Sequence, residues 1–101
     1  LVSSQAIVSS QAIVSRQAVL AVRFIAKAFA VKEAAAKALG TGFRLGVKFS
    51  EFEITKDSLN KPHLELLGVA KSFGISRSVG AIHVSVTDEK EHVVAFVVME
   101  T

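Results

Sequence analysis

One helix-forming stretch constrains the fold of this chain more than any other feature. From about Arg16 to Leu39, apolar residues recur at three- and four-residue steps, and Ala, Lys, Glu and Leu predominate. This spacing places the apolar side chains on one face of an α-helix, and these residue types are good helix formers. Gly40 and Gly42 follow, and glycine readily takes the left-handed conformation that ends many helices. The sequence therefore predicts one long helix that ends near Leu39.

Short strands and one short helix are predicted after it. Apolar residues stand at the odd positions Val47 and Phe49 and then at the even positions Phe52 and Ile54, so the apolar face of the chain switches between them. A turn or bulge is therefore expected between two short strands, near residues 50–51. Further expected elements are a polar turn at 57–62, strands at 63–67, 82–87 and 93–99, a helix at 68–74 and a charged hairpin loop at 88–91. The strand at 93–99 is almost wholly apolar and is expected to be central. This order predicts an α+β fold, with one long helix packed on a small, mostly antiparallel sheet.

The first twenty residues are dominated by a repeat. Residues 2–19 read VSSQAI, VSSQAI and VSRQAV. In a helix, successive copies face different ways because six residues turn by about 600°. In a strand, both faces mix apolar and polar residues, and the repeat is too short to stack the coils of a hexapeptide β-helix. We therefore expect residues 1–20 to form a poorly packed N-terminal segment and residues 21–101 to form the folded domain.

Composition excludes several classes of protein. Half of the 101 residues are hydrophobic, which predicts a folded chain and not a disordered one. The chain has no Cys, which fits a reducing compartment, and we expect a cytoplasmic location. Charged residues interrupt the longest apolar stretch, so no membrane span is predicted. The net charge of +3 is small and scattered, which argues against nucleic acid as a partner and allows an anionic ligand.

The densest candidate site lies at the end of the long helix. Glu33 and Lys37 are four residues apart, so both side chains lie on one helical face. A carboxylate suits a hard cation such as Mg²⁺, and an ammonium one turn further on can hold a phosphate bridged to it. The following glycines allow a ligand to approach the backbone closely. The alternative is an ordinary surface pair, worth about 0.2–0.5 kcal/mol.

Three segments of the chain resemble the holo-acyl-carrier-protein synthase family of the 4'-phosphopantetheinyl transferase superfamily. FAVKEAAAKALGTG, at residues 29–42, is similar to the family's signature helix. LNKPHLEL, at 59–66, resembles its Lys-Pro turn, and HVSVTDEKEHVVAFVV, at 83–98, resembles its closing hairpin. The resemblance extends over roughly Val22 to Glu100. It implies the phosphopantetheinyl transferase fold.

The resemblance also implies the roles of individual residues. Glu33, Lys37 and Asp88 are the implied catalytic residues: Glu33 helps to hold Mg²⁺ on the coenzyme A pyrophosphate, Lys37 contacts phosphate, and Asp88 lies beside the nucleotide with a proton-handling role. Implied nucleotide contacts are Lys37, Gly40, Thr41, Gly42, Lys61 and Pro62. His83 is expected to be structural, because a lone His is weak evidence for a site.

The implied reaction transfers 4'-phosphopantetheine from coenzyme A to a serine of acyl carrier protein, in fatty acid biosynthesis. The serine attacks the β-phosphate, and 3',5'-ADP leaves. Mg²⁺ is the implied cofactor. The resemblance further implies a homotrimer with active sites between subunits.

Three departures from the family pattern bear on activity. The family's first strand carries a metal-binding aspartate, and this chain has no acidic residue before Glu33. Ala28 stands where relatives carry an arginine, which removes a phosphate contact. The family's early basic helix is also missing, and Asn60 replaces a glycine in the turn. We therefore expect weak or no transferase activity. The alternative hypothesis is a non-catalytic or truncated remnant of the fold that at most binds coenzyme A.

Overall fold

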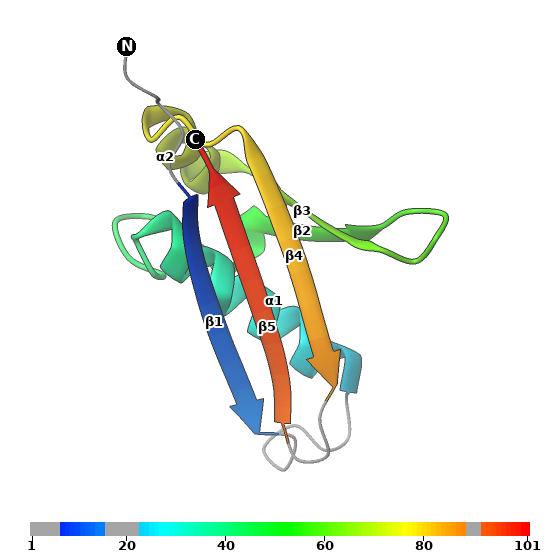
Figure 1. Ribbon diagram of the computed structural model, residues 1–101. Helices are drawn as coiled ribbons and strands as arrows, with labels where there is room; N and C mark the ends of the chain where they lie inside the picture. The colour runs from blue at the N-terminus through cyan, green and yellow to red at the C-terminus, as the bar shows by residue number, and fades with distance from the viewer. Residues whose placement is uncertain (1–6, 16–22, 89–91) are drawn as a thin grey trace.

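The computed structural model describes residues 7–15, 23–88 and 92–101, with side chains from Lys27 onward (Figure 1). In chain order its elements are β1 (Ile7–Ser15), α1 (Arg23–Leu39), the 3-10 helix η2 (Phe49–Glu51), β2 (Phe52–Lys56), β3 (Pro62–Leu66), α2 (Gly68–Ser76), β4 (Ala81–Asp88) and β5 (His92–Glu100). None of the helices in these ranges has the length and hydropathy needed to cross a membrane.

Two antiparallel sheets make up the β-structure. The larger has the order β1-β5-β4, so the apolar strand β5 is central, as predicted. The smaller is the β2–β3 hairpin, which protrudes to the right in Figure 1. Helix α1 lies behind the larger sheet in that view. The predicted α+β class is confirmed, with one long helix against a small antiparallel sheet.

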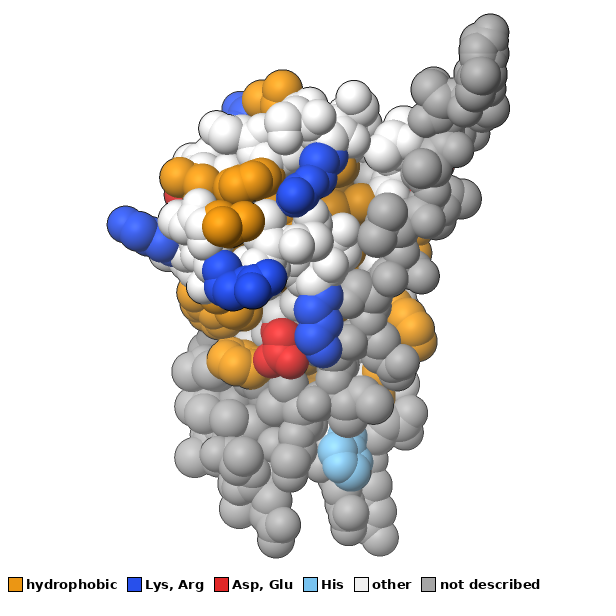
Figure 2. All heavy atoms as spheres, turned by 90° about the vertical axis from the view of Figure 1, so that its left-hand side faces the viewer, with side chains coloured by type: hydrophobic (Ala, Val, Ile, Leu, Met, Phe, Trp, Pro, Cys, Tyr) orange, Lys and Arg blue, Asp and Glu red, His pale blue; other side chains and the backbone are white. Residues whose placement is uncertain are grey.

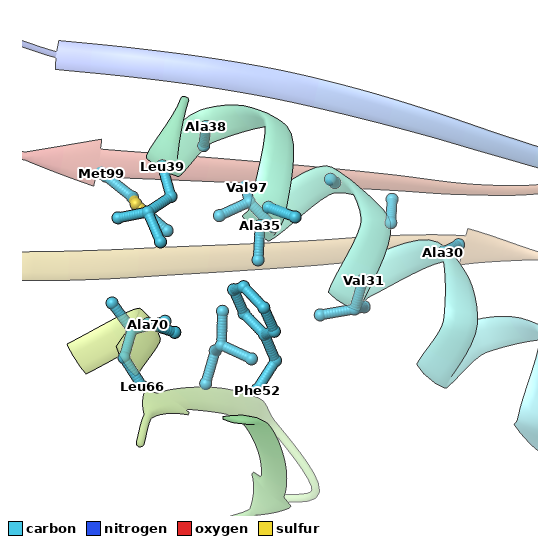
Figure 3. Close-up of a cluster of buried hydrophobic side chains, with 14 of the residues drawn as sticks. Ala30, Val31, Ala35, Ala38, Leu39, Phe52, Leu66, Ala70, Val97 and Met99 are labelled. Atoms are coloured by element: carbon cyan, nitrogen blue, oxygen red, sulfur yellow. The ribbon is translucent and has the colours of Figure 1, made fainter. Parts of the chain in front are cut away.

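The core lies between α1 and the back of the larger sheet (Figure 3). The buried face of α1 consists largely of alanines, whose small side chains let the helix approach the sheet closely. Phe52, fully buried, carries the β2–β3 hairpin into this core. Other buried core residues are Val31, Leu39, Leu66, Ala70, Val93, Ala95, Val97 and Met99.

The predicted strand at residues 47–49 is wrong. The chain has no regular structure at Val47 and Lys48 and then forms η2. The carboxylate of Glu51 explains this turn, because Oε1 accepts the Lys48 N–H at 2.8 Å and Oε2 accepts the Val69 N–H at 2.7 Å. These hydrogen bonds, that of Lys48 first, hold the pKa of Glu51 below its ordinary value. One side chain thus ties the loop after α1 to the first turn of α2.

Gly74 does not end the short helix, as the sequence suggested, because α2 continues to Ser76. Gly74 is buried, and a Cβ added there would lie 2.8 Å from Leu66 Cδ1. Gly74 therefore packs closely against the Leu66 side chain of β3, which would have to move aside for a larger residue. Part of the predicted long helix, residues 16–22, and residues 89–91 of the predicted hairpin loop lie outside the described residues.

An N-terminal strand is present, although none was expected. Residues Ile7–Ser15 of the repeat form β1, which pairs antiparallel with the whole of β5. Its register sets Val8 opposite Met99 and Val14 opposite Val93, both buried on β5. Backbone pairing with a preformed apolar strand does not require a clean amphipathic pattern, which is why the pattern failed to predict it. The structure thus shows strand pairing within the segment 1–20 that was expected to pack poorly, and the domain boundary at residue 20 stays a prediction.

Candidate functional site

Glu33 and Lys37 lie on one face of α1, as their spacing predicts. Lys37 Nζ is 3.8 Å from Glu33 Oε1, and the two side chains are 55% and 33% exposed respectively. Both groups are thus within reach of a ligand. Lys37 also lies in the last turn of α1, where a cation opposes the negative end of the helix dipole.

The loop Gly40–Gly42 leaves α1 in a left-handed conformation. Gly40 has φ +90° and Gly42 φ +60°, and both amides donate to the carbonyl of Ala36, at 3.2 and 3.0 Å. Among the described residues, no atom would lie within 4 Å of a Cβ added to Gly42, so this side of the loop is open to them. Thr41 is fully buried, and its hydroxyl donates to the Gly42 carbonyl at 2.7 Å. The Thr41 side chain is therefore not available to a ligand, and the open side of the loop lies at Gly42.

Two arginines that sequence analysis missed hold this loop. Arg44 Nε donates to the Thr41 carbonyl at 3.3 Å, and Arg77 Nη1 donates to the Leu39 carbonyl. Nothing in the local sequence identifies Arg77, since it follows Leu39 by 38 residues and belongs to the end of α2.

Asp88 lies beside Lys27. Lys27 Nζ is 3.4 Å from Asp88 Oδ2. Lys27 and Glu33 are six residues apart in the helix, and this places the two side chains about 120° apart around α1. Asp88 thus pairs with a lysine that lies about a third of a turn around α1 from Glu33.

A cleft of about 950 Å³ opens between α1, the β2–β3 hairpin and β4. Its lining mixes apolar, hydroxyl, cationic and acidic side chains: Lys27, Ala28, Val31, Lys32, Ser50, Phe52, Glu53, Ile54, Thr55, Lys56, Asn60, Pro62, Val84, Ser85 and Val86. Pro62 and Ala28 thus line this cleft, whereas Glu33, Lys37 and the Gly40–Gly42 loop do not.

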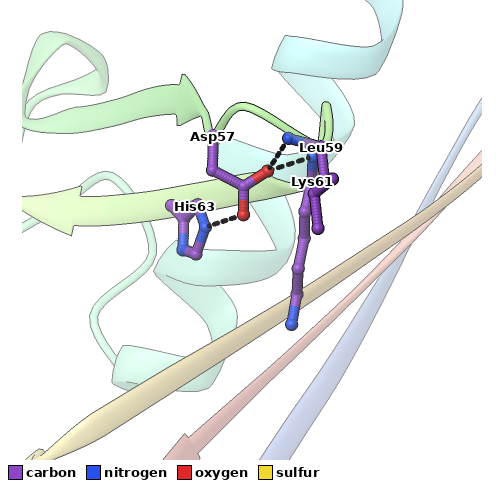
Figure 4. A network of polar contacts seen from close by, with 4 residues as sticks. All are labelled: Asp57, Leu59, Lys61 and His63. Atoms are coloured by element: carbon purple, nitrogen blue, oxygen red, sulfur yellow. Dashed lines mark hydrogen bonds and ion pairs between the residues drawn. The ribbon is translucent and has the colours of Figure 1, made fainter.

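The turn that presents Lys61 and Pro62 is built around Asp57 (Figure 4). Asp57 Oδ1 accepts the N–H groups of Leu59 and Lys61, both at 2.9 Å, and Oδ2 lies 2.9 Å from His63 Nε2. The His63 bond first, and then these backbone donors, hold the pKa of Asp57 below its ordinary value. Asn60 takes φ +65°, which Asn tolerates better than most residues.

His83, which is expected from the sequence to be structural, pairs with the carboxylate of Glu100 across β4 and β5. Its side chain is exposed, away from the cleft lining. Among the described residues, no group of three or more His, Cys, Asp and Glu is placed to hold a metal ion. Glu33, the one metal ligand predicted from the sequence, therefore has no group of further metal-binding side chains around it among the described residues.

Comparisons with known proteins show which family this fold and sequence belong to. The model of the 4'-phosphopantetheinyl transferase superfamily matches residues 5–97. The chain belongs to this superfamily. The holo-[acyl-carrier-protein] synthase of Klebsiella pneumoniae (strain 342) is 54% identical over 80 residues, 79% of this chain and 64% of that protein. The chain thus spans about 64% of the length of this curated relative.

Solved structures agree with the fold of this superfamily member. The crystal structure of holo-[acyl-carrier-protein] synthase from Neisseria meningitidis has a TM-score of 0.78 at 26% identity, over 93% of this chain and 98% of that one. A holo-(acyl-carrier-protein) synthase from Bacillus anthracis, in complex with CoA (3',5'-ADP), has a TM-score of 0.71 at 25% identity, over 95% and 99% of the two chains. The family resemblance and the fold predicted from it are confirmed.

Proposed function

We propose that this protein is a holo-acyl-carrier-protein synthase, which transfers 4'-phosphopantetheine from coenzyme A to a serine of acyl carrier protein in fatty acid biosynthesis. The observation that carries the proposal is the pair Glu33–Lys37, which directly precedes the open Gly40–Gly42 loop in a superfamily fold. A carboxylate can hold the metal of a metal-bridged pyrophosphate, an ammonium can neutralise its charge, and glycines let a ligand approach the backbone closely. We place the reaction in the cytoplasm.

Glu33 is the residue that would hold Mg²⁺, and Lys37 the residue that would contact a phosphate oxygen. A bound Mg²⁺ would neutralise charge on the pyrophosphate. Mg²⁺ often takes only one or two carboxylates, with phosphate oxygens and waters as its other ligands, so a single carboxylate is compatible with a weak site.

The transfer itself is a displacement at phosphorus. The carrier serine oxygen bonds to the β-phosphorus, the bond to the 3',5'-ADP oxygen breaks, and the hydroxyl proton must leave. Such a reaction depends on positioning and charge neutralisation more than on covalent chemistry by the protein. Lys37 neutralises negative charge on the phosphate. Asp88, which is paired with Lys27, is our candidate to accept the proton of the serine hydroxyl.

The proposed site has two separate parts, because the cleft lining does not include Glu33, Lys37 or the glycine loop. Glu33, Lys37 and the glycine loop form one part, and the cleft with Pro62 and Lys61 beside it forms the other. A site completed between copies of the chain would join them, so we propose a homotrimer. In support, no described helix covers the front of the larger sheet in Figure 1, where Phe96 of β5 is 45% exposed.

We propose reduced activity for two electrostatic reasons. Among the described residues no group of three or more His, Cys, Asp and Glu surrounds Glu33, and Ala28 lines the cleft at the position where the resembled family has an arginine. Loss of one electrostatic donor in comparable sites costs roughly 10²–10³ in rate. The second candidate function, a non-catalytic protein that binds coenzyme A, is favoured by the same two observations.

Calorimetric titration with coenzyme A and Mg²⁺ tests the proposed site. We expect Glu33→Gln to abolish the Mg²⁺ dependence of binding, and Lys37→Gln to weaken binding by about tenfold or more, as for a hydrogen bond to a charged group. Lys71→Gln, an exposed change on α2, is the control. Absence of coenzyme A binding, or binding that ignores both substitutions, would contradict the proposal. Light scattering tests the trimer against the 10.7 kDa monomer.

A further inference from the structure

Arg77 is fixed against the glycine loop by contacts on two sides. Its Nη1 donates to the carbonyl of Leu39, the last residue of α1. Its guanidinium lies over the ring of Phe73, with 5.1 Å between Cζ and the ring centroid. A Cβ added to Gly40 would lie 3.7 Å from Nη1, so the guanidinium is directly beside the backbone of the loop.

The position of the loop makes a cation necessary for anion binding. Gly40–Gly42 follows the C-terminal end of α1, where the helix dipole is negative and carbonyl groups, not N–H groups, point outward. An anion near bare carbonyls is repelled. Lys37, Arg44 and Arg77 all lie at this end of the helix, and the two arginines donate to loop carbonyls. Figure 2, which shows the side of the molecule on the left in Figure 1, has several Lys and Arg side chains among hydrophobic ones.

We propose that Arg77 binds a phosphate group of a nucleotide ligand at the Gly40–Gly42 loop. The bond to Leu39 uses one N–H of the guanidinium fork, and the fork has further donors for phosphate oxygens. Because that bond and the Phe73 ring hold the side chain, little rotamer entropy remains to be lost on binding. The inference rests on the proposed function for the identity of the ligand, coenzyme A, but not for the presence of an anion site.

Three variants test Arg77. Arg77→Gln removes the charge and Arg77→Lys keeps the charge without the fork. Lys71→Gln removes an exposed charge from the same helix and is the matched control. Each is titrated with coenzyme A and with inorganic pyrophosphate at several salt concentrations, while NMR follows the amides of Gly40 and Gly42. We expect Arg77→Gln to weaken binding of both probes roughly 10- to 100-fold, Arg77→Lys to weaken it less, and Lys71→Gln to change it by less than about twofold.

The salt dependence separates phosphate binding from a structural role. If Arg77 contacts phosphate, the affinity of Arg77→Gln falls less steeply with added salt than that of the unaltered protein. Weaker binding with an unchanged salt dependence would overturn the inference, as would unaltered affinity in Arg77→Gln. It would also be overturned if pyrophosphate left the Gly40 and Gly42 signals of the unaltered protein unmoved. Arg77-dependent pyrophosphate binding without coenzyme A binding would support the anion site and contradict the proposed function.

Discussion

Replacement of Phe52 by alanine is predicted to be the most damaging single change in the core. The Phe52 side chain is fully buried, it joins the β2–β3 hairpin to α1, and its ring stands edge-on to that of Phe43 at 5.9 Å between centroids. Truncation of a buried Phe to Ala costs about 3–5 kcal/mol, from lost burial and the cavity left behind. Domains are stable by about 5–15 kcal/mol, so this loss is a large fraction of the total.

Urea and thermal unfolding measure the effect. For a domain of this size, 1 kcal/mol shifts Tm by about 4–8 °C, so Phe52→Ala is expected to lower Tm by more than about 12 °C. Phe52→Leu keeps most of the volume and should cost clearly less. Leu59→Ala, at a side chain 87% exposed, is the control and should leave Tm nearly unchanged. A loss below about 1 kcal/mol in Phe52→Ala would refute the assignment of Phe52 to the core.

Three further predictions concern the hairpin turn, α2 and β1. The hydrogen bond from His63, first among several, lowers the pKa of Asp57 in the folded protein. The ionised carboxylate therefore stabilises the turn at any pH above the pKa of Asp57 in the unfolded chain, about 3.9, and this stabilisation is lost as the pH falls through the lower pKa of the folded protein. NMR shifts of the Leu59 and Lys61 amides should follow this acid titration and lose it in Asp57→Asn. Gly74→Ala should change the free energy of unfolding in urea by less than about 1 kcal/mol, because the strain of a Cβ against Leu66 Cδ1, the end of a flexible side chain, is offset by the helix propensity of alanine, and a loss above about 3 kcal/mol would show that Leu66 cannot move aside. Deletion of residues 1–15 should lower Tm by more than about 5 °C if the pairing of β1 with β5 contributes stability, whereas an unchanged Tm would support the sequence-based expectation of little packing.

The parts of the fold that depend on local pattern were predictable from the sequence. The end of α1 at Leu39 follows from helix-forming residues and two glycines, and the central position of β5 follows from its apolar run. The pattern failed at β1, because that strand depends on pairing with β5, more than seventy-five residues away in every register pair of the ladder. It also failed at residues 47–49, where the Glu51 carboxylate binds backbone amides and holds a turn in place of a strand.

The candidate site was predictable to a similar degree. Glu33 and Lys37 were found because helical spacing alone brings them together. The contact between Lys27 and Asp88, and the contact of Arg77 with the end of α1, both join segments distant in the chain. Neither has a local signature, and so only the folded structure reveals them.

The most direct test of the account is the mass of an apo acyl carrier protein incubated with this protein, coenzyme A and Mg²⁺. We predict slow addition of 4'-phosphopantetheine that requires near-stoichiometric amounts of the protein and is lost in Glu33→Gln, because a metal held by a single carboxylate neutralises the pyrophosphate poorly. No addition at any level would favour the non-catalytic alternative. Complete conversion at catalytic levels, or conversion that survives Glu33→Gln, would contradict the account.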